Sequence, residues 1–248
     1  MQAEKLSPGP AAAKLAPLPE QSPTQAALPM ALAIFDLDNT LIAGDSDHLW
    51  GEWLCARGLV DADAFAARNT QFYADYRAGT LDIHAYLAFA LAPLRGRSVA
   101  EVADWQRRFL ADCIEPIMLP AARALIRGHR ANGDTLLVIT ATNEVVTRPI
   151  VDALGVEHLI GCGVEVVDGV YTGEAVGVPS YREGKVDRLH SWLEERPGES
   201  LAGATFYSDS HNDLPLLKRV DYPVAVDPDP ELAARAAASG WQVISLRG

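Results

Sequence analysis

The sequence has few cysteines, no long apolar run and no excess of positive charge. The cysteines Cys55, Cys113 and Cys162 are odd in number and lack a CxxC spacing. A disulfide framework or a structural zinc site is therefore not expected, and reduced thiols in a cytoplasmic protein are the simplest interpretation. No apolar run approaches the roughly 20 residues that span a bilayer. The net charge of −12 argues against nucleic acid or an anionic membrane as a partner, although a bound cation can still admit a small anion.

The length and composition are those of a globular protein with one large domain and an insertion, or with two modest domains. Nearly half of the 248 residues are apolar and 22% are charged, so disorder of the whole chain is not expected. Residues 1–29 are rich in Ala, Pro and Gln and contain no continuous apolar segment. We expect them to be a flexible leader rather than a signal peptide, and we exclude them from the predicted fold.

Short apolar runs that stop abruptly at polar residues predict strands buried on both faces of a parallel sheet. These runs occupy 31–35, 135–139, 204–207, 223–226 and 242–246. Helical patterns alternate with them at 120–131, 143–154 and 184–196, and Pro149 is expected to kink the second of these helices or end it early. The Asp168-Gly169 pair inside 164–176 predicts a hairpin. The fold class that follows is α/β, with a doubly wound parallel sheet.

The alternation of strands and helices fails between Asp45 and about residue 116. This stretch is helical in character and carries aromatic and aliphatic residues throughout. Because it lies between the first and second predicted strands, we expect a helical cap domain at 45–116, inserted into a core domain made of 30–44 and 117–248.

Polar residues follow the first three predicted strands at the point where each strand ends. Asp36 and Asp38 follow the first strand, in FDLDNTL, Thr140 follows the second, and Asp209 follows the third. The carboxyl ends of parallel strands form the usual ligand crevice of such a sheet. Two close carboxylates need a cation between them, or else one of them stays protonated. Taken singly, each motif has an ordinary explanation as a polar turn or a helix cap.

Two further stretches add to this pattern. Lys185 is expected at a helix start, where the helix dipole disfavours a cation unless an anion lies nearby. In SDSHNDLP (208–215), Ser210 and Asp213 form a capping box, which explains neither Asp209 nor Asn212. Aspartyl-phosphate chemistry requires a carboxylate nucleophile, an acid/base, hydrogen-bond donors for the phosphoryl oxygens and hard oxygen ligands for a divalent ion. These groups occur in the four stretches.

Together the four motifs resemble the haloacid dehalogenase superfamily, in the branch that contains phosphoserine phosphatase. FDLDNTL resembles the DxDxT signature, and Thr140, Lys185 in REGK and SDSHNDLP resemble the second, third and fourth motifs. The resemblance covers residues 31 to about 246. It implies a Rossmann-like core with a helical cap of that branch, and a Mg²⁺-dependent phosphomonoester hydrolase.

The resemblance also implies a role for each residue. Asp36 attacks phosphorus and becomes an aspartyl phosphate, and Asp38 protonates the leaving alkoxide and then deprotonates the attacking water. Asp36, Asp209 and the backbone carbonyl of Asp38 bind Mg²⁺. Thr140 and Lys185 contact the phosphoryl oxygens. Asn212 contacts the substrate and orients the water shell of the metal, and Asp213 orients the lysine.

The substrate expected is a small phosphorylated metabolite, such as an amino-acid or amino-alcohol phosphate, with phosphoserine and histidinol phosphate as the two leading examples. The second motif reads TAT, and the cap lacks the arginine segment of phosphoserine phosphatases, so both substrates stay open. Asp45 is expected to pair with a substrate ammonium group, and Arg77 is the nearest basic candidate in the cap. His48, His84 and the aromatic cap residues are expected to be core or surface.

Two other classes of protein share these groups. A receiver-type signalling domain also places Asp, Thr and Lys around Mg²⁺, but it lacks a second acid such as Asp38 and a long cap. An inactive protein of the same fold is disfavoured because every expected chemical group is present. Phosphotransfer to another alcohol stays open, and the sequence gives no indication of oligomeric state.

Overall fold

The structure is a computed structural model that describes residues 31–247. The leader expected at 1–29 lies outside the described residues. Seven strands form one sheet in the order β4-β3-β2-β1-β5-β6-β7. Their bounds are β1 Leu32–Phe35, β2 Thr135–Asn143, β3 His158–Val167, β4 Val170–Val176, β5 Thr205–Ser208, β6 Tyr222–Val226 and β7 Gln242–Ile244. All neighbouring pairs are parallel except β3–β4.

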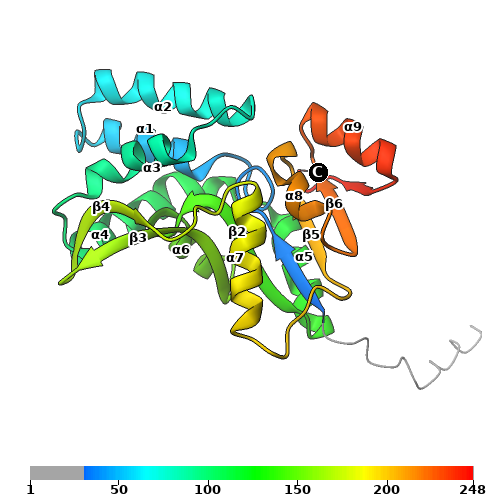
Figure 1. The fold of residues 1–248 in the computed structure, drawn as a ribbon. Coiled ribbons are helices and arrows are strands. Elements are labelled where there is room, and N and C mark those ends of the chain that lie inside the picture. The colour runs from blue at the N-terminus through cyan, green and yellow to red at the C-terminus, as the bar shows by residue number, and fades with distance from the viewer. Residues whose placement is uncertain (1–30, 248) are drawn as a thin grey trace, which may run out of the picture.

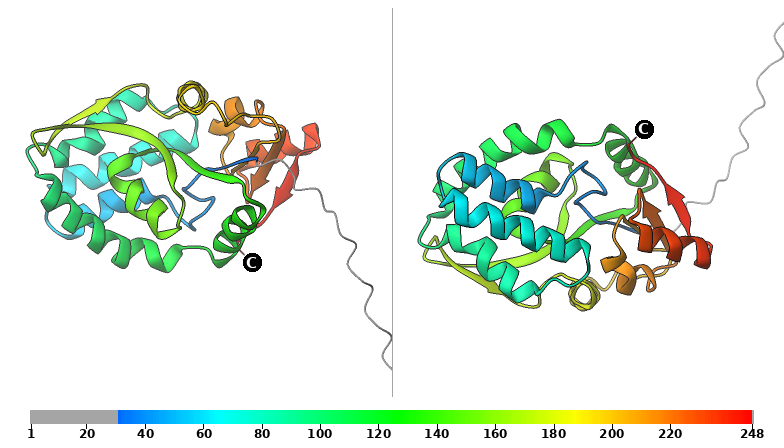
Figure 2. Two further views of the ribbon diagram at one scale, coloured as in Figure 1. Left: turned by 90° about the horizontal axis from the view of Figure 1, so that it is seen from below. Right: turned by 90° about the horizontal axis from the view of Figure 1, so that it is seen from above.

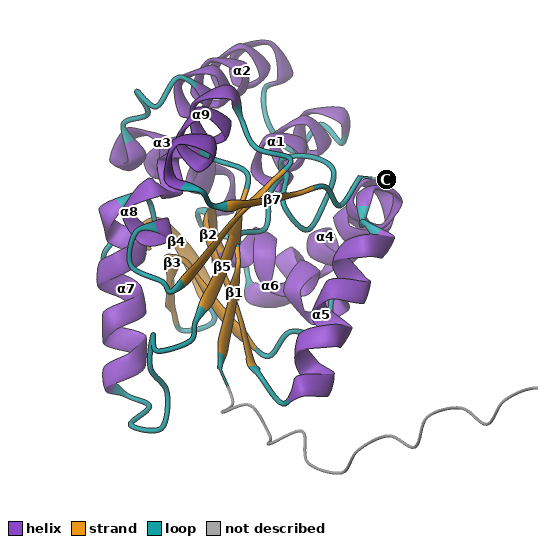
Figure 3. Ribbon diagram, turned by 90° about the vertical axis from the view of Figure 1, so that its right-hand side faces the viewer, coloured by secondary structure: helices purple, strands orange, loops and turns teal. Residues whose placement is uncertain are grey.

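Helices cover both faces of this sheet, which confirms the predicted doubly wound α/β class (Figure 3). One face packs against α5 Pro120–Asn132 and α6 Glu144–Ala153, and the other against α7 Glu183–Glu194, α8 Leu214–Leu217 and α9 Pro230–Ser239. Alternate residues of β1 serve the two faces. Phe35 belongs to the core with Ile126, and Ile34 belongs to the core with Leu189. This is why the strand is apolar at every position.

A helical insert occupies residues 46–117, between β1 and α5. It contains α1 Ser46–Ala56, α2 Ala62–Arg77, α3 Ile83–Leu91 and α4 Val99–Phe109, with short turns η1 Ala92–Leu94, η2 Leu110–Ile114 and η3 Glu115–Ile117. Ile42 and Met118 pair as an isolated bridge, so the two ends of the insert lie side by side. Figures 1 and 2 show α1, α2 and α3 at the edge of the sheet where β1 and β2 end.

The proline in α6 does not end the helix, so the early break considered for Pro149 is wrong. Proline lacks the N–H that would donate to the carbonyl four residues earlier, which belongs to Val145. That carbonyl accepts instead from Nε2 of Gln106 on α4, at 2.5 Å. The hydrogen bond that the helix loses is therefore replaced by a link between the insert and the core.

The predicted hairpin is present as β3–β4. Val167 pairs with Val170, and the intervening Asp168 and Gly169 both have positive φ, as a type I′ turn requires. The first half of β3 is not marked in the sequence. From His158 to Ile160 this strand pairs in parallel with β2 before it enters the hairpin.

Candidate active site

The polar residues predicted to line a crevice come from strand ends at one edge of the sheet. Asp36 directly follows β1, Asp209 directly follows β5, and Thr140 lies in the last part of β2. Asn39 has a φ of 56°, a left-handed conformation that asparagine tolerates better than most residues. The chain turns there, and Lys185 enters the same edge from the first turn of α7.

Lys185 is the cation at the centre of the site. Its Nζ lies 2.8 Å from Oδ1 of Asp36 and 2.7 Å from Oδ1 of Asp213, and its side chain is 1% exposed. Ser208 donates its hydroxyl to Asp213 at 2.7 Å. Burial by itself would lower the pKa of Lys185, but the carboxylates of Asp213 and Asp36 outweigh burial and raise it. The lysine therefore stays charged, and Asp213 lies where it can orient it.

Asp36 and Asp209 lie on either side of the Thr40 hydroxyl. Thr40 Oγ1 is 3.5 Å from Oδ2 of Asp36 and 3.1 Å from Oδ1 of Asp209, and it accepts from the backbone N–H of Asp209. Burial, opposed in part by Lys185, raises the pKa of Asp36 to about 7. Burial and the charge of Asp36 raise the pKa of Asp209 well above its ordinary range. The two carboxylates therefore destabilise each other's charged form.

These residues fit a hard divalent cation. The sets of three or more His, Cys, Asp or Glu side chains that hold metals in many proteins do not occur among residues 31–247. The set expected here differs in kind, because it combines two carboxylates with a backbone carbonyl. Asp36 and Asp209 offer oxygen ligands of the type that Mg²⁺ prefers, and a cation between them would offset their mutual repulsion.

Asp38 is the second acid of the site. Its Oδ1 accepts from the backbone N–H of Ser46 at 2.6 Å, and its Oδ2 accepts from the Thr142 hydroxyl at 2.9 Å, with the Thr140 hydroxyl at 3.5 Å. Burial, and then the charge of Asp45, raise the pKa of Asp38 to about 7. A carboxyl that keeps its proton near neutral pH is suited to general acid catalysis.

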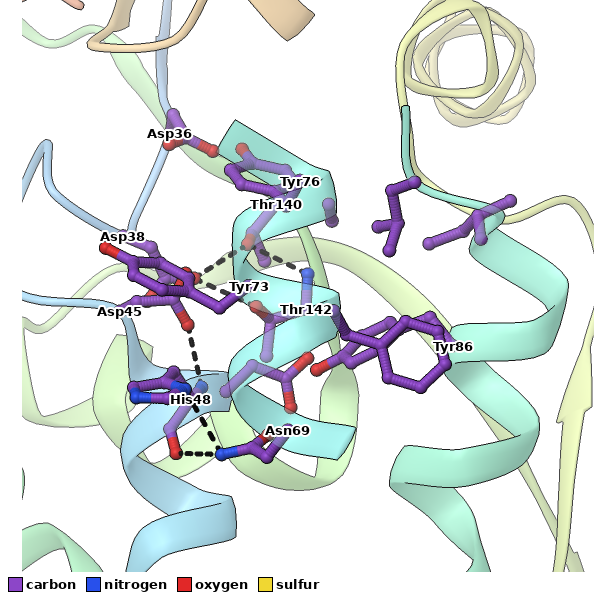
Figure 4. A pocket seen from close by; sticks show the side chains of 15 residues that line it. Asp36, Asp38, Asp45, His48, Asn69, Tyr73, Tyr76, Tyr86, Thr140 and Thr142 are labelled. Carbon is purple, nitrogen blue, oxygen red and sulfur yellow. Dashed lines mark hydrogen bonds between the residues drawn. The ribbon is translucent and has the colours of Figure 1, made fainter. Parts of the chain in front are cut away.

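A cavity extends from Asp36 beneath the helical insert (Figure 4). Its lining combines acidic, aromatic and hydroxyl side chains. It consists of Asp36, Asp38, Asp45, Asp47, His48, Asn69, Phe72, Tyr73, Tyr76, Leu81, Ile83, Tyr86, Thr140, Ala141 and Thr142. Among residues 31–247, no lysine or arginine belongs to this lining. In Figure 4, Asp36 lies at one end of the cavity, and Asn69 and Tyr86 lie away from it.

The expected cap residues differ in their positions. Asp45 lines the cavity, and it also caps α1, because its Oδ1 accepts from the backbone N–H of His48 at 2.8 Å. Arg77 lines a neighbouring cavity that shares Tyr73 and Tyr76 with the first. Its guanidinium lies 6.0 Å from the Tyr73 ring centroid. Arg77 is therefore outside the cavity that contains Asp36.

Asn212 connects the insert to the core. Its Nδ2 donates to the Tyr76 carbonyl at 2.9 Å, and its Oδ1 accepts from the Tyr181 hydroxyl and from Nε of Arg182, both at 3.1 Å. Both polar atoms of its side-chain amide are thus hydrogen-bonded within the protein. The lining of the Asp36 cavity does not include Asn212, which differs from the substrate contact expected for it.

Several cavity residues were not singled out from the sequence. They are Asp47, Asn69, Tyr73, Tyr76, Tyr86 and Thr142, and His48 joins them although it was expected to be core or surface. His84, by contrast, is exposed. Among these residues, only Thr142 had an indication in the sequence, because it is the second hydroxyl-bearing residue after Ile139. The aromatic residues of the insert gave no such indication, because core and cavity positions share the same composition.

Comparison with known proteins places these groups in a family. Residues 33–218 match the profile of the haloacid dehalogenase-like hydrolases. A histidinol-phosphatase of Neisseria meningitidis is 50% identical over 220 residues, which are 87% of this chain and 99% of that protein. A phosphoserine phosphatase of Mycobacterium tuberculosis, SerB1, is 34% identical over 220 residues, which are 88% of this chain and 71% of that protein.

A solved structure from Bordetella pertussis Tohama I, of a protein with unknown function, is also similar. It has a TM-score of 0.82 and 43% sequence identity, and the match covers 88% of this chain and 100% of that one. The chain therefore belongs to the haloacid dehalogenase-like hydrolase family. This excludes the receiver-type alternative. Within the part of the chain that the structure describes, no helix has the length and apolar character needed to cross a membrane.

Proposed function

We propose that this protein is a phosphatase that hydrolyses histidinol phosphate. The observation that carries the proposal is the lining of the Asp36 cavity, which has three further carboxylates, aromatic walls and no lysine or arginine. Histidinol phosphate has an ammonium group and an imidazole ring but no carboxylate. Phosphoserine has a carboxylate, which would need a cation in this cavity.

The charge of the cavity discriminates between the two substrates. Burial raises the pKa of Asp38, Asp45 and Asp47, each to about 7. A substrate carboxylate would add a further negative charge to this desolvated cluster without an opposite charge to offset it. An ammonium group would have the opposite effect and would stabilise the ionised form of the acids around it.

The walls of the cavity suit a planar ring. Phe72, Tyr73 and Tyr86 line it, and the rings of Tyr73 and His48 stack with centroids 4.8 Å apart. Aromatic side chains bind planar rings through dispersion and stacking. The relatives agree with this choice, because the histidinol-phosphatase is 50% identical to this chain and the phosphoserine phosphatase 34%.

The mechanism follows the positions of the groups. Asp36 attacks the phosphorus atom and forms an aspartyl phosphate, while Lys185 and Thr140 hold the phosphoryl oxygens. Asp38 donates its proton to the leaving alkoxide. It then accepts a proton from the water that hydrolyses the aspartyl phosphate. Mg²⁺ held by Asp36, Asp209 and the Asp38 carbonyl would supply positive charge for the phosphoryl group.

Three phosphate esters test the proposal, because they differ by one group at a time. Phosphoethanolamine has the ammonium group alone. Relative to phosphoethanolamine, phosphoserine carries an added carboxylate, and histidinol phosphate carries an added imidazolylmethyl group instead. With Mg²⁺ present, we expect kcat/KM to be highest for histidinol phosphate and lowest for phosphoserine. A higher kcat/KM for phosphoserine than for phosphoethanolamine would contradict the proposal, because it would mean that the carboxylate is recognised.

The cellular setting is part of the proposal. The substrate is a small metabolite, and we place the enzyme in the cytoplasm, where thiols such as those of Cys55, Cys113 and Cys162 stay reduced.

A further inference from the structure

Asp47 and Tyr86 form a neighbouring pair of side chains in the cavity, away from the nucleophile. Asp47 lies in the first turn of α1 and is 7% exposed, and the hydroxyl of Tyr86 on α3 lies beside its carboxylate. Both residues line the Asp36 cavity. In Figure 4, Thr140 and Thr142 lie between Asp36 and Tyr86. The pair is thus positioned for a part of the substrate that is distant from the phosphate.

Apart from the nucleophile Asp36, the other two carboxylates of the cavity already have several donors. Asp38 lies near three, which are the N–H of Ser46 and the hydroxyls of Thr140 and Thr142. Asp45 accepts from the backbone N–H groups at the start of α1, including those of Asp47 and His48.

Asp47 is less well satisfied among the described residues. Apart from Tyr86, its contact is with Nδ2 of Asn143 at 3.5 Å, which is long for a hydrogen bond. A carboxylate can accept about four hydrogen bonds. A buried carboxylate with unused capacity that lines a cavity is suited to an N–H donor from a ligand.

The geometry of the substrate decides which donor this is. In histidinol phosphate the ammonium group is on the carbon next to the phosphate-bearing carbon. With the phosphate at Asp36, this group would face Asp38 and Asp45, the acids that interact electrostatically with Asp36. The imidazole ring is one methylene further away, toward Asp47. We propose that Asp47, oriented by the Tyr86 hydroxyl, accepts a hydrogen bond from the imidazole N–H and makes the enzyme specific for that ring. This inference rests on the proposed function.

A ring without an N–H gives the sharpest comparison. Phenylalaninol phosphate keeps the phosphate, the ammonium group and a planar ring of similar size, but it offers Asp47 no donor. Sites built to hydrogen-bond a substrate group discriminate strongly against analogues that lack it, because a buried polar group is left unpaired. A hydrogen bond to a charged group is worth about 1.5–3 kcal/mol, which corresponds to roughly 10- to 100-fold in kcat/KM.

The experiment measures the ratio of kcat/KM for histidinol phosphate to that for phenylalaninol phosphate. We expect a ratio of about 10 or more in the wild type, a ratio near unity in Asp47→Leu, and an intermediate ratio in Tyr86→Phe, which loses only the hydroxyl. Asp63→Asn is the matched control, because it removes an exposed carboxylate of the insert and should keep the wild-type ratio.

Binding of the product alcohols gives a second readout that needs no turnover. Calorimetric titration should show that the wild type binds histidinol more tightly than phenylalaninol and that Asp47→Leu loses this preference. If Asp47→Leu kept the wild-type preference in both measurements, the imidazole contact assigned to Asp47 would be wrong, while the proposed function would stand. Preference for phosphoserine over phosphoethanolamine in the wild type would instead overturn the proposed function.

Discussion

The ammonium nitrogen of Lys185 lies 2.8 Å from Oδ1 of Asp36, although 149 positions separate the two residues in the sequence. Asp213 contacts the same nitrogen from a third segment of the chain. All three side chains are almost fully buried. Since each isolated charge would be costly to bury, the three groups depend on one another.

Replacement of the central cation tests this dependence. Lys185→Met leaves Asp36 and Asp213 as neighbouring buried carboxylates, and breaking a buried ion pair in this way typically costs about 3–5 kcal/mol. We expect a loss of stability of that order in urea unfolding at pH 7. Turnover should fall by at least about a hundredfold, because the phosphoryl oxygens lose their cation. Wild-type stability and turnover would exclude the central role of this lysine.

Variants of Asp36 and Asp38 should block different steps of the reaction. Asp36→Asn removes the nucleophile and should lower kcat by at least about a thousandfold while circular dichroism stays unchanged. Asp38→Asn keeps the nucleophile but loses the base. With p-nitrophenyl phosphate, whose leaving group needs no acid, this variant should release one equivalent of nitrophenolate rapidly and then turn over slowly. Slow release without a burst would contradict the role given to Asp38.

Removal of divalent metal should abolish activity reversibly. Excess chelator is expected to stop turnover and lower Tm, because a cation that binds only the folded protein stabilises it, and added Mg²⁺ should restore both. Loss of one charged ligand in Asp209→Asn is worth about 1.5 kcal/mol or more. The Mg²⁺ concentration for half-maximal activity should therefore rise at least about tenfold. Full activity in chelator would contradict the proposed metal site.

The stability of the ligand-free protein should depend on Asp47 and on pH. Burial raises the pKa of Asp47 to about 7 from an ordinary value of 3.8. Between these values the folded protein binds more protons than the unfolded chain, so stability falls as pH rises through this window. Asp47→Asn has no carboxyl to ionise at this position, so it does not lose this stability as pH rises. Its Tm should exceed that of the wild type by at least about 2 °C at pH 8, and the difference should shrink at pH 4.5.

An equal Tm difference at both pH values would mean that Asp47 is ionised in the folded protein throughout this range. Asp63→Asn again serves as the control, since an exposed carboxylate should give little change in Tm at either pH.

Asn212 should matter for the stability of the folded protein. Asn212→Ala removes the amide that joins Tyr76 in α2 to Tyr181 and Arg182 in the core. Loss of buried hydrogen bonds costs about 1–3 kcal/mol, and each kcal/mol lowers Tm by about 2–4 °C for a protein of this size. Asn132→Ala, at the exposed end of α5, is the control. Equal melting temperatures would show that the amide does not hold the insert.

The sequence predicted the sheet and most of the residues that come together around Lys185. Each of these is marked locally, either by a buried strand that ends or by a helix that begins, and parallel strands bring such positions to one edge. The first half of β3 escaped prediction because its pairing partner in β2 is more than fifteen residues away. The continuation of α6 past Pro149 is equally invisible in the local sequence, since the donor that replaces the missing N–H comes from Gln106 on another helix.

The cavity, in contrast, was decided by tertiary structure. Arg77 and Tyr73 are four residues apart on α2 and share a helical face. Only Tyr73 lines the Asp36 cavity, because the packing of the insert against the core encloses only part of that face. Asn212 is used for that packing, and Asp47 faces the cavity with few partners. Local sequence determined where the reactive groups leave their strands, because strand and helix ends are local events. Only the folded chain decided what surrounds the substrate, because that depends on contacts between segments far apart in the sequence.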